Sequence, residues 1–218
     1  MPKPIFGING SGMHVHQSLS DFSGKNLFSA PNHGMCLSPL AIHFIAGQLA
    51  HARALAGVVA PSVNSYKRLV PGYEAPVYVG WAQTNRSALI RIPRYMPGQE
   101  QAARAELRCP DPSCNPYLAF TTMLAAGLDG IDRQLTPPEP LNNVNVYELE
   151  PDIRLKMGIE ELPGSLLEAL NELARDEMLQ QSLGSEVYTA FRRAKLAEWD
   201  EYRTHVTDWE IEHYLELT

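Results

Sequence analysis

The sequence predicts an α+β protein with an antiparallel sheet in its first half and helices towards its end. Segments of the first half alternate apolar and polar residues, as half-buried strands do, whereas apolar residues of the last third recur at helical spacing. The composition is that of an ordinary globular protein, because 44% of the 218 residues are hydrophobic and 20% are charged. A disordered chain, a collagen-like chain and a disulfide scaffold are therefore excluded.

The first expected strand covers residues 13–18 and places His14, His16 and Ser18 on one face. Residues 9–12 precede it, and their two glycines permit a ligand to approach the backbone closely. An imidazole on such a strand can bind a metal or contact a phosphate. The alternative is a pair of exposed strand histidines without a ligand.

A helix is expected to begin at Ser38 and Pro39, since serine is a good N-cap and proline fits the first turn. Apolar residues at helical spacing extend it to Ala56, and Gly57 is the expected stop. Residues 61–74 follow with two prolines and several turn formers, which predict a loop.

Two further strands are expected at residues 77–81 and 88–92, joined by a turn at residues 83–86. Three arginines, Arg68, Arg86 and Arg91, lie in this region. Arginines fixed near strands suit bidentate recognition of phosphates and carboxylates, although a loop arginine is as often only solvated.

Residues 103–107 alternate again and place Arg104, Glu106 and Arg108 on one face. Two cations beside Glu106 favour its ionised form and make that face attract anions. A carboxylate that binds a divalent cation between anion-binding arginines is what a phosphoryl-transfer site needs. The alternative is a cross-strand ion-pair ladder, in which each exposed pair contributes about 0–1 kcal/mol.

The second half of the chain reads as helices and connections. Asn115 opens a strongly apolar helix that is expected to end within residues 127–130. Residues 134–163 are rich in proline and predict a long surface connection.

The helical tail begins at Ser165, the first residue of a capping box that opens a helix over residues 166–177. A longer amphipathic helix follows at residues 185–206, and a second capping box at Thr207 opens a short terminal helix. The expected organisation is a sheet with site motifs, a linker and a helical tail, at residues 1–133, 134–163 and 164–218.

Charge is spread unevenly along the chain. Residues 1–110 hold ten Lys or Arg and four Asp or Glu, whereas residues 111–218 hold eight and twenty-one. The arginines of the first half stand singly and its lysines are few, so no nucleic-acid partner is expected. Their surface either binds small anions or faces an acidic partner domain.

Targeting signals and nucleotide-binding signatures are absent from the sequence. The mostly apolar stretch at residues 40–61 is interrupted by polar residues, so no membrane span is expected, and the N-terminus shows no signal peptide. The three cysteines, Cys36, Cys109 and Cys114, do not have zinc-ligand spacing, and we expect reduced thiols in a cytoplasmic protein. The sequence contains no P-loop, dinucleotide-binding fingerprint or nucleophile elbow.

Four motifs together carry a family resemblance. They are Asn-Gly-Ser-Gly-Met-His-Val-His-Gln-Ser at 9–18, Asn-Ser-Tyr-Lys-Arg-Leu-Val-Pro-Gly-Tyr-Glu-Ala-Pro at 64–76, Asn-Arg-Ser-Ala-Leu-Ile-Arg-Ile-Pro at 85–93 and Glu-Leu-Arg-Cys-Pro-Asp-Pro-Ser-Cys-Asn-Pro-Tyr at 106–117. In this order they closely resemble glutamine synthetase, in its prokaryotic class I form. The resemblance implies ATP-dependent ligation of ammonia to L-glutamate through γ-glutamyl phosphate, with Mg²⁺ or Mn²⁺.

The same resemblance implies a role for each matching residue. The implied metal ligands are His14 and Glu106. The implied glutamate contacts are Asn9, Gly10, Arg68, Glu74 and Arg108. The implied ATP contacts are His16, Gln17, Ser18, Arg86, Arg91 and Arg104. The implied catalytic residues are Glu74, on a flap that shields the intermediate, with Arg86 and Arg108. Tyr147 falls where some relatives carry an adenylylated tyrosine, although its surroundings match only in part.

The resemblance also sets three further expectations. The N-terminal β-grasp domain, the other metal ligands and a partner-subunit aspartate of the family lie upstream of the matched motifs, so the isolated chain is expected to be inactive. The terminal helix resembles a strap that joins the two rings of a homo-oligomer, a dodecamer in the full-length family. A γ-glutamyl-amine ligase and a non-catalytic nucleotide-binding or assembly fragment stay open as alternatives.

Overall fold

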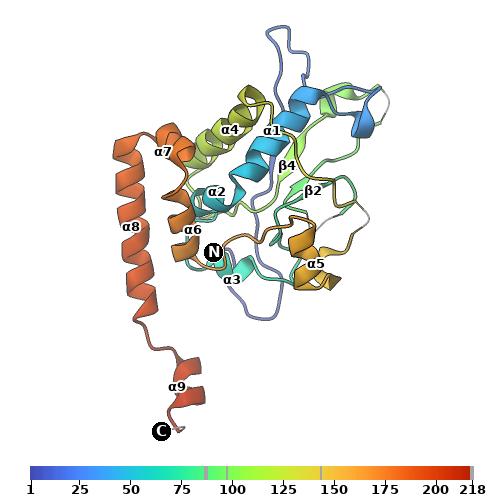
Figure 1. Ribbon diagram of the computed structural model, residues 1–218. Helices are drawn as coiled ribbons and strands as arrows, with labels where there is room; N and C mark the ends of the chain where they lie inside the picture. Colours follow the sequence, from blue (N-terminus) through green and yellow to red (C-terminus); the bar gives the residue numbers. More distant parts are fainter. Residues whose placement is uncertain (86–87, 97, 143, 217–218) are drawn as a thin grey trace.

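The computed structural model describes residues 1–85, 88–96, 98–142 and 144–216. Its sheet has the strand order β1 (Val15–Gln17), β4 (Ala105–Leu107), β3 (Ile90–Arg91) and β2 (Trp81–Ala82). Long helices gather on one side of this sheet, and α1 crosses in front of β4 in Figure 1. The expected α+β class is confirmed.

The sheet is mixed, whereas the sequence predicted an antiparallel one. β4 is antiparallel to both β1 and β3, but β2 and β3 run parallel, with Trp81 opposite Ile90. The expected hairpin turn between these strands is therefore wrong. The chain leaving β2 is hydrogen-bonded to Asn142, whose side-chain oxygen accepts from the Gln83 amide at 2.7 Å and whose carbonyl accepts from the Thr84 hydroxyl at 2.9 Å.

The first long helix is broken. The Ser38 hydroxyl caps α1 (Pro39–Ala50) by accepting from the Ala41 amide at 3.2 Å, as expected. At His51 the chain bends by 75° into α2 (Ala52–Val59). Gly57 does not end this helix, which continues to Val59. Instead, Gly57 packs closely against α6 (Leu166–Leu173), because a Cβ at this position would lie 3.1 Å from the Ala169 carbonyl oxygen.

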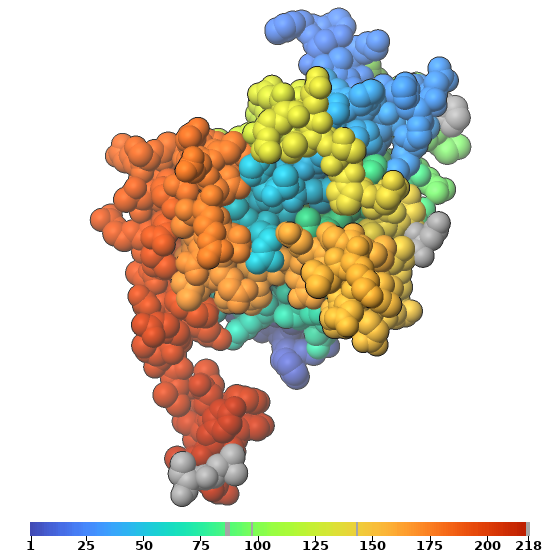
Figure 2. All heavy atoms as spheres, viewed as in Figure 1, coloured from blue at the N-terminus to red at the C-terminus, as the bar shows by residue number. Residues whose placement is uncertain are grey.

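Helix α4 (Pro116–Asp132) lies against α1 with the two backbones in contact. Asn115 caps α4 by accepting from the Tyr117 amide at 3.0 Å. A Cβ on Gly47 would lie 2.1 Å from the Ala126 carbonyl oxygen, and one on Gly130 would lie 2.2 Å from the His43 carbonyl oxygen. Only glycine at these two positions lets the helices approach this closely. Figure 2 shows α1 and α2 in cyan between α4 and the orange helices.

The helical tail has more breaks than the sequence predicted. Helix α6 ends at Leu173, and Asp176 caps a new helix, α7 (Glu177–Leu183), by accepting from the Leu179 amide at 3.0 Å. Ser165 caps α6, but the Glu168 carboxylate accepts from the Gly164 amide at 2.8 Å, so the expected capping box is incomplete.

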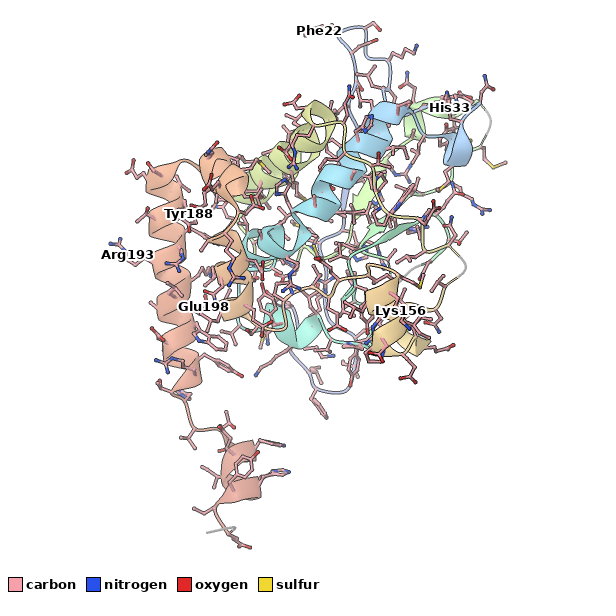
Figure 3. The ribbon with its side chains drawn as sticks, viewed as in Figure 1. Phe22, His33, Lys156, Tyr188, Arg193 and Glu198 are labelled. Atoms are coloured by element: carbon pink, nitrogen blue, oxygen red, sulfur yellow. The ribbon has the colours of Figure 1, made fainter. Side chains whose placement is uncertain are left out.

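Helix α8 (Ser185–Arg203) runs down one side of the body, and α9 (Asp208–Tyr214) projects beyond it (Figures 1 and 2). Tyr188 and Glu198 point from α8 towards the body and Arg193 points away in Figure 3. The capping box at Thr207 is present, as expected.

Residues 134–163 form more than a surface connection. They contain two short helices, η3 (Val146–Glu148) and α5 (Pro151–Lys156). Three of their side chains pack with the β2 region into a second core, separate from the main core between the sheet and the helices. That second core contains Val77, Tyr78, Ala82, Ala88, Leu141, Val146 and Ile159. The remaining short elements are η1 (Gly34–Cys36), α3 (Ser65–Arg68) and η2 (Glu100–Ala102).

Within the described ranges, no single helix is both long and apolar enough to cross a membrane. The bent pair α1 and α2 reaches that length and composition only when the two are joined, and most of their side chains are buried in the main core. All three cysteines are free thiols; Cys109 and Cys114 are buried and Cys36 is partly exposed.

Candidate active site

Glu106 is the centre of a charged cluster on the sheet. Its side chain is 4% exposed. Arg91 lies directly opposite on β3, and its Nη1 is 3.0 Å from Glu106 Oε2. His14 precedes β1, and its Nδ1 is 3.0 Å from Glu106 Oε1. The Nε of Arg108 approaches the same oxygen at 3.5 Å.

The cluster is buried on one side and open on the other. Arg108 is 7% exposed, whereas the side chains of Arg91 and His14 are 38% and 37% exposed. Among the described residues Arg108 Nε is buried and makes no hydrogen bond, and it faces Glu106 Oε1 at ion-pair distance. Burial lowers the pKa of Arg108, an effect that the charge of Glu106 opposes.

His14 is favoured in its neutral form. Burial lowers its pKa and the positive charge of Arg108 lowers it further, whereas Glu106 opposes both. A neutral imidazole keeps a lone pair on one nitrogen, which is the form that binds metals. The imidazole of His14 can therefore act as a ligand on the open side of the cluster.

The donors fit part of a divalent-cation site. The His14 imidazole and the Glu106 carboxylate are within contact of each other, and Mn²⁺ and Mg²⁺ accept such ligands. Across the described parts of the chain, no group of three or more His, Cys, Asp and Glu side chains is arranged to hold a metal ion. The described residues therefore supply two neighbouring metal ligands, His14 and Glu106, and not a complete set.

Arg68 supports the segment that follows β4. It is 4% exposed, and its guanidinium donates to the carbonyls of Arg108 at 3.0 Å, Cys109 at 2.8 Å and Pro110 at 3.2 Å. A Cβ on Gly12 would lie 2.3 Å from Arg68 Nη2, so glycine there leaves room for the guanidinium. In this structure Arg68 positions the backbone that carries Arg108.

Polar residues of β1 form a second group next to the cluster. Arg104 Nε donates to His16 Nδ1 at 3.1 Å. Gln17 accepts from the amide of the buried Gln48 at 2.7 Å. Ser18 is exposed.

The remaining expected residues lie in loops. Asn9 is exposed, and a Cβ on Gly10 would lie 2.4 Å from the Pro2 carbonyl oxygen. Glu74 is exposed and adopts a left-handed backbone with φ of 53°. Tyr147 is half-buried. Arg86, expected to neutralise the phosphoryl group, lies outside the described residues.

The structure therefore brings His14, Arg91, Glu106 and Arg108 into one cluster. Sequence reasoning missed Gln48, which is part of an otherwise apolar helix and gives no local signal of its contact with Gln17. It also missed the contacts of His51 with Asp129 and Asp176, because these two residues are 78 and 125 residues away in the sequence.

Comparisons with known proteins identify the family of the chain. Residues 1–214 match the glutamine synthetase catalytic domain. A glutamine synthetase of Thermus thermophilus is 54% identical over 215 residues, which cover 99% of this chain and 47% of the relative. One of Methanocaldococcus jannaschii is 51% identical over 218 residues, covering 99% of this chain and 46% of the relative. The chain thus spans about half the length of the curated relatives it matches.

Two solved structures share the fold. "GmaS/ADP complex-Conformation 1" has a TM-score of 0.87 and "Apo GmaS without ligand" one of 0.84, each at 39% identity. They cover 99% of this chain and 48% and 47% of the respective solved chains. Fold and motifs together define a segment of a ligase catalytic domain. The chain belongs to the glutamine synthetase family.

Proposed function

We propose that the Glu106 cluster serves the ATP-dependent ligation of ammonia to L-glutamate, which passes through γ-glutamyl phosphate and gives glutamine, ADP and phosphate. One observation carries the proposal: a buried carboxylate lies within contact of two arginines and an imidazole. Phosphoryl transfer is catalysed by positioning and by charges that offset those of the transferring oxygens. This cluster supplies charges of that kind at fixed positions on a sheet.

In this function His14 and Glu106 would hold one edge of a Mg²⁺ or Mn²⁺ ion. The bound ion supplies positive charge to the nucleotide phosphates. The positive charge of Arg108 would stabilise the transferring phosphoryl oxygens, and Arg86 is proposed to offset the same charge. Arg91 pairs with Glu106 from the neighbouring strand, and its partly exposed side chain is proposed to contact ATP.

The substrate pockets are proposed on either side of this cluster. Glutamate would contact Asn9, Gly10, Arg68, Glu74 and Arg108. Arg68 is buried and donates to the carbonyls of Arg108, Cys109 and Pro110, so its proposed contribution to the glutamate pocket is through the position of Arg108. ATP would contact His16, Gln17, Ser18, Arg86, Arg91 and Arg104. Glu74 is proposed to lie on the flap that excludes water and to take up the ammonium proton.

Two alternatives remain distinct from this function. The structural neighbours named GmaS are 39% identical, and a γ-glutamyl-amine ligase would use the same phosphate site with another amine. Identities of 51% and 54% to glutamine synthetases favour ammonia. A non-catalytic nucleotide-binding or assembly fragment would bind ATP without ammonia-dependent turnover. A homo-oligomer joined by the α9 strap, a cytoplasmic location and adenylylation of Tyr147 stay predictions.

The test is a chimera in which these 218 residues replace the matching segment of the Thermus thermophilus relative. We expect ATP- and glutamate-dependent phosphate release that requires ammonia. Release should be lost in Glu106→Ala and kept in Glu139→Ala, whose carboxylate is exposed. Higher turnover with methylamine than with ammonia would favour the amine ligase. Nucleotide binding without phosphate release would contradict the catalytic proposal.

The isolated chain, assayed in parallel, tests the expectation that it is inactive alone. Ammonia-dependent turnover at the rate of the chimera would overturn that expectation. Circular dichroism of the same sample separates an inactive folded chain from an unfolded one.

A further inference from the structure

Tyr147 joins the second core to the loop that carries Glu74. Its hydroxyl donates to the Ala75 carbonyl at 2.8 Å, across 72 residues of sequence. Its ring packs edge-on against Tyr78, with ring centroids 5.6 Å apart. The hydroxyl therefore holds the backbone immediately after Glu74, and the ring holds the hydroxyl in place.

The loop needs such support. Glu74 adopts a left-handed backbone, with φ of 53°, which costs a residue other than glycine conformational energy. On one side of Glu74, the Lys3 ammonium lies 3.7 Å from the centroid of the Tyr73 ring. On the other side, Ala75 is 2% exposed and its carbonyl is the acceptor for Tyr147. Glu74 is thus exposed between two fixed neighbours.

Tyr147 is also subject to the charge of the cluster. The positive charge of Arg108 acts on its hydroxyl and lowers its pKa, against a larger increase caused by burial. Arg108 is in turn the residue that contacts Glu106. The hydroxyl that holds the Glu74 loop is therefore also influenced by the charge of Arg108.

We propose that Tyr147 is a positioning residue that fixes Glu74 relative to Arg108 through its hydrogen bond to the Ala75 carbonyl. This inference rests on the proposed function for its catalytic consequence, but the loop contact itself does not. Tyr147 acts only through the loop and touches no reacting atom.

The loop contact is tested first, in the 218-residue chain. A glutamate-specific protease cleaves after Glu74 only when the loop opens, and cleavage after Glu212 in α9 is the internal reference. Tyr147→Phe keeps the ring and removes one hydrogen bond, so cleavage after Glu74 should rise about three- to tenfold relative to Glu212. Tyr95→Phe is the control, because it removes the hydroxyl contacts to the Cys36 carbonyl (2.9 Å) and the Ser29 hydroxyl (3.0 Å) elsewhere. An unchanged ratio in Tyr147→Phe overturns the proposal.

Catalysis is tested in the chimera. Tyr147→Phe should lower kcat by about three- to tenfold and leave the KM for ATP unchanged, while Tyr95→Phe changes neither. An unchanged kcat in an active chimera overturns the positioning role. A chimera that is inactive with Tyr147 in place contradicts the proposed function instead, and the protease ratio still decides whether Tyr147 holds the loop.

Discussion

Two histidines in this protein contact carboxylates, yet their surroundings favour opposite charge states. His14 shares Glu106 with Arg91 and Arg108, so its one carboxylate is already balanced by two cations. His51 lies at the bend between α1 and α2. Its Nδ1 is 2.6 Å from Asp176 Oδ2 and its Nε2 is 3.0 Å from Asp129 Oδ2.

The pKa shifts follow from these neighbours. Burial and Arg108 lower the pKa of His14. Burial also acts to lower the pKa of His51, but hydrogen bonds to Asp176 and Asp129 outweigh it and the pKa rises. Only an imidazolium donates from both ring nitrogens, so the geometry of His51 requires the charged form. The charge state of a histidine that contacts a carboxylate therefore depends on the other charged groups around that carboxylate.

The largest expected effect comes from removing the carboxylate that His14 shares. Glu106→Ala leaves Arg108, which is 7% exposed, as a buried charge without its partner. We expect the free energy of unfolding to fall by about 3–5 kcal/mol, measured by urea denaturation. The exposed Glu139→Ala should change it by about 0.5 kcal/mol or less. A loss as small as that of the control would contradict the buried-charge interpretation.

A smaller and pH-dependent effect is expected at His51. Asp176→Asn keeps a good cap for α7 but removes the charge that faces Nδ1. The folded pKa of His51 lies above its usual value of 6.5, so its contribution to stability is complete below 6.5 and is lost as pH rises through the folded pKa.

Asp176→Asn should therefore lower the free energy of unfolding by about 1–3 kcal/mol at pH 6 and by less at pH 8. Urea denaturation at the two pH values measures this, with the exposed Asp132→Asn as the control. A difference that grows with pH would show that His51 is neutral in the folded protein.

The smallest expected effect is a difference between the pKa values of His14 and His51. In buffer with EDTA, NMR titration should give His14 a pKa below 6.5 and His51 a pKa above it. The pH dependence of stability has the opposite sign for His14. Its contribution to the free energy of unfolding is complete above pH 6.5 and is lost as the pH falls through the folded pKa. Glu106→Gln should lower the pKa of His14 further, since Glu106 raises it, and leave His51 unchanged. Equal midpoints for the two histidines would refute the comparison.

The sequence predicted the parts of the site that depend on local spacing. Alternation along residues 103–107 places Glu106 and Arg108 on one face, and the structure brings both into the same cluster. The caps at Ser38, Asn115 and Thr207 are confirmed, because capping needs only residues within one turn.

Features that depend on distant residues could not be predicted in this way. The chain between the parallel strands β2 and β3 is hydrogen-bonded to Asn142, some sixty residues further along the chain. Gly57 was expected to end a helix, but it lies inside α2 and allows close packing against Ala169, which is far away in the sequence. The His51 cluster assembles from the bend between α1 and α2, from α4 and from the residue that caps α7, and none of its members lies in a motif.

The three thiols differ in a way that matters for chemical labelling. Burial raises the pKa of Cys109 to about 12 and that of Cys114 to about 11. The thiolate is the reactive form, so near neutral pH these two thiols are inert towards maleimides, while Cys36 is partly exposed. The unaltered sequence therefore accepts a fluorophore at one defined position, beside the carbonyl that Tyr95 holds.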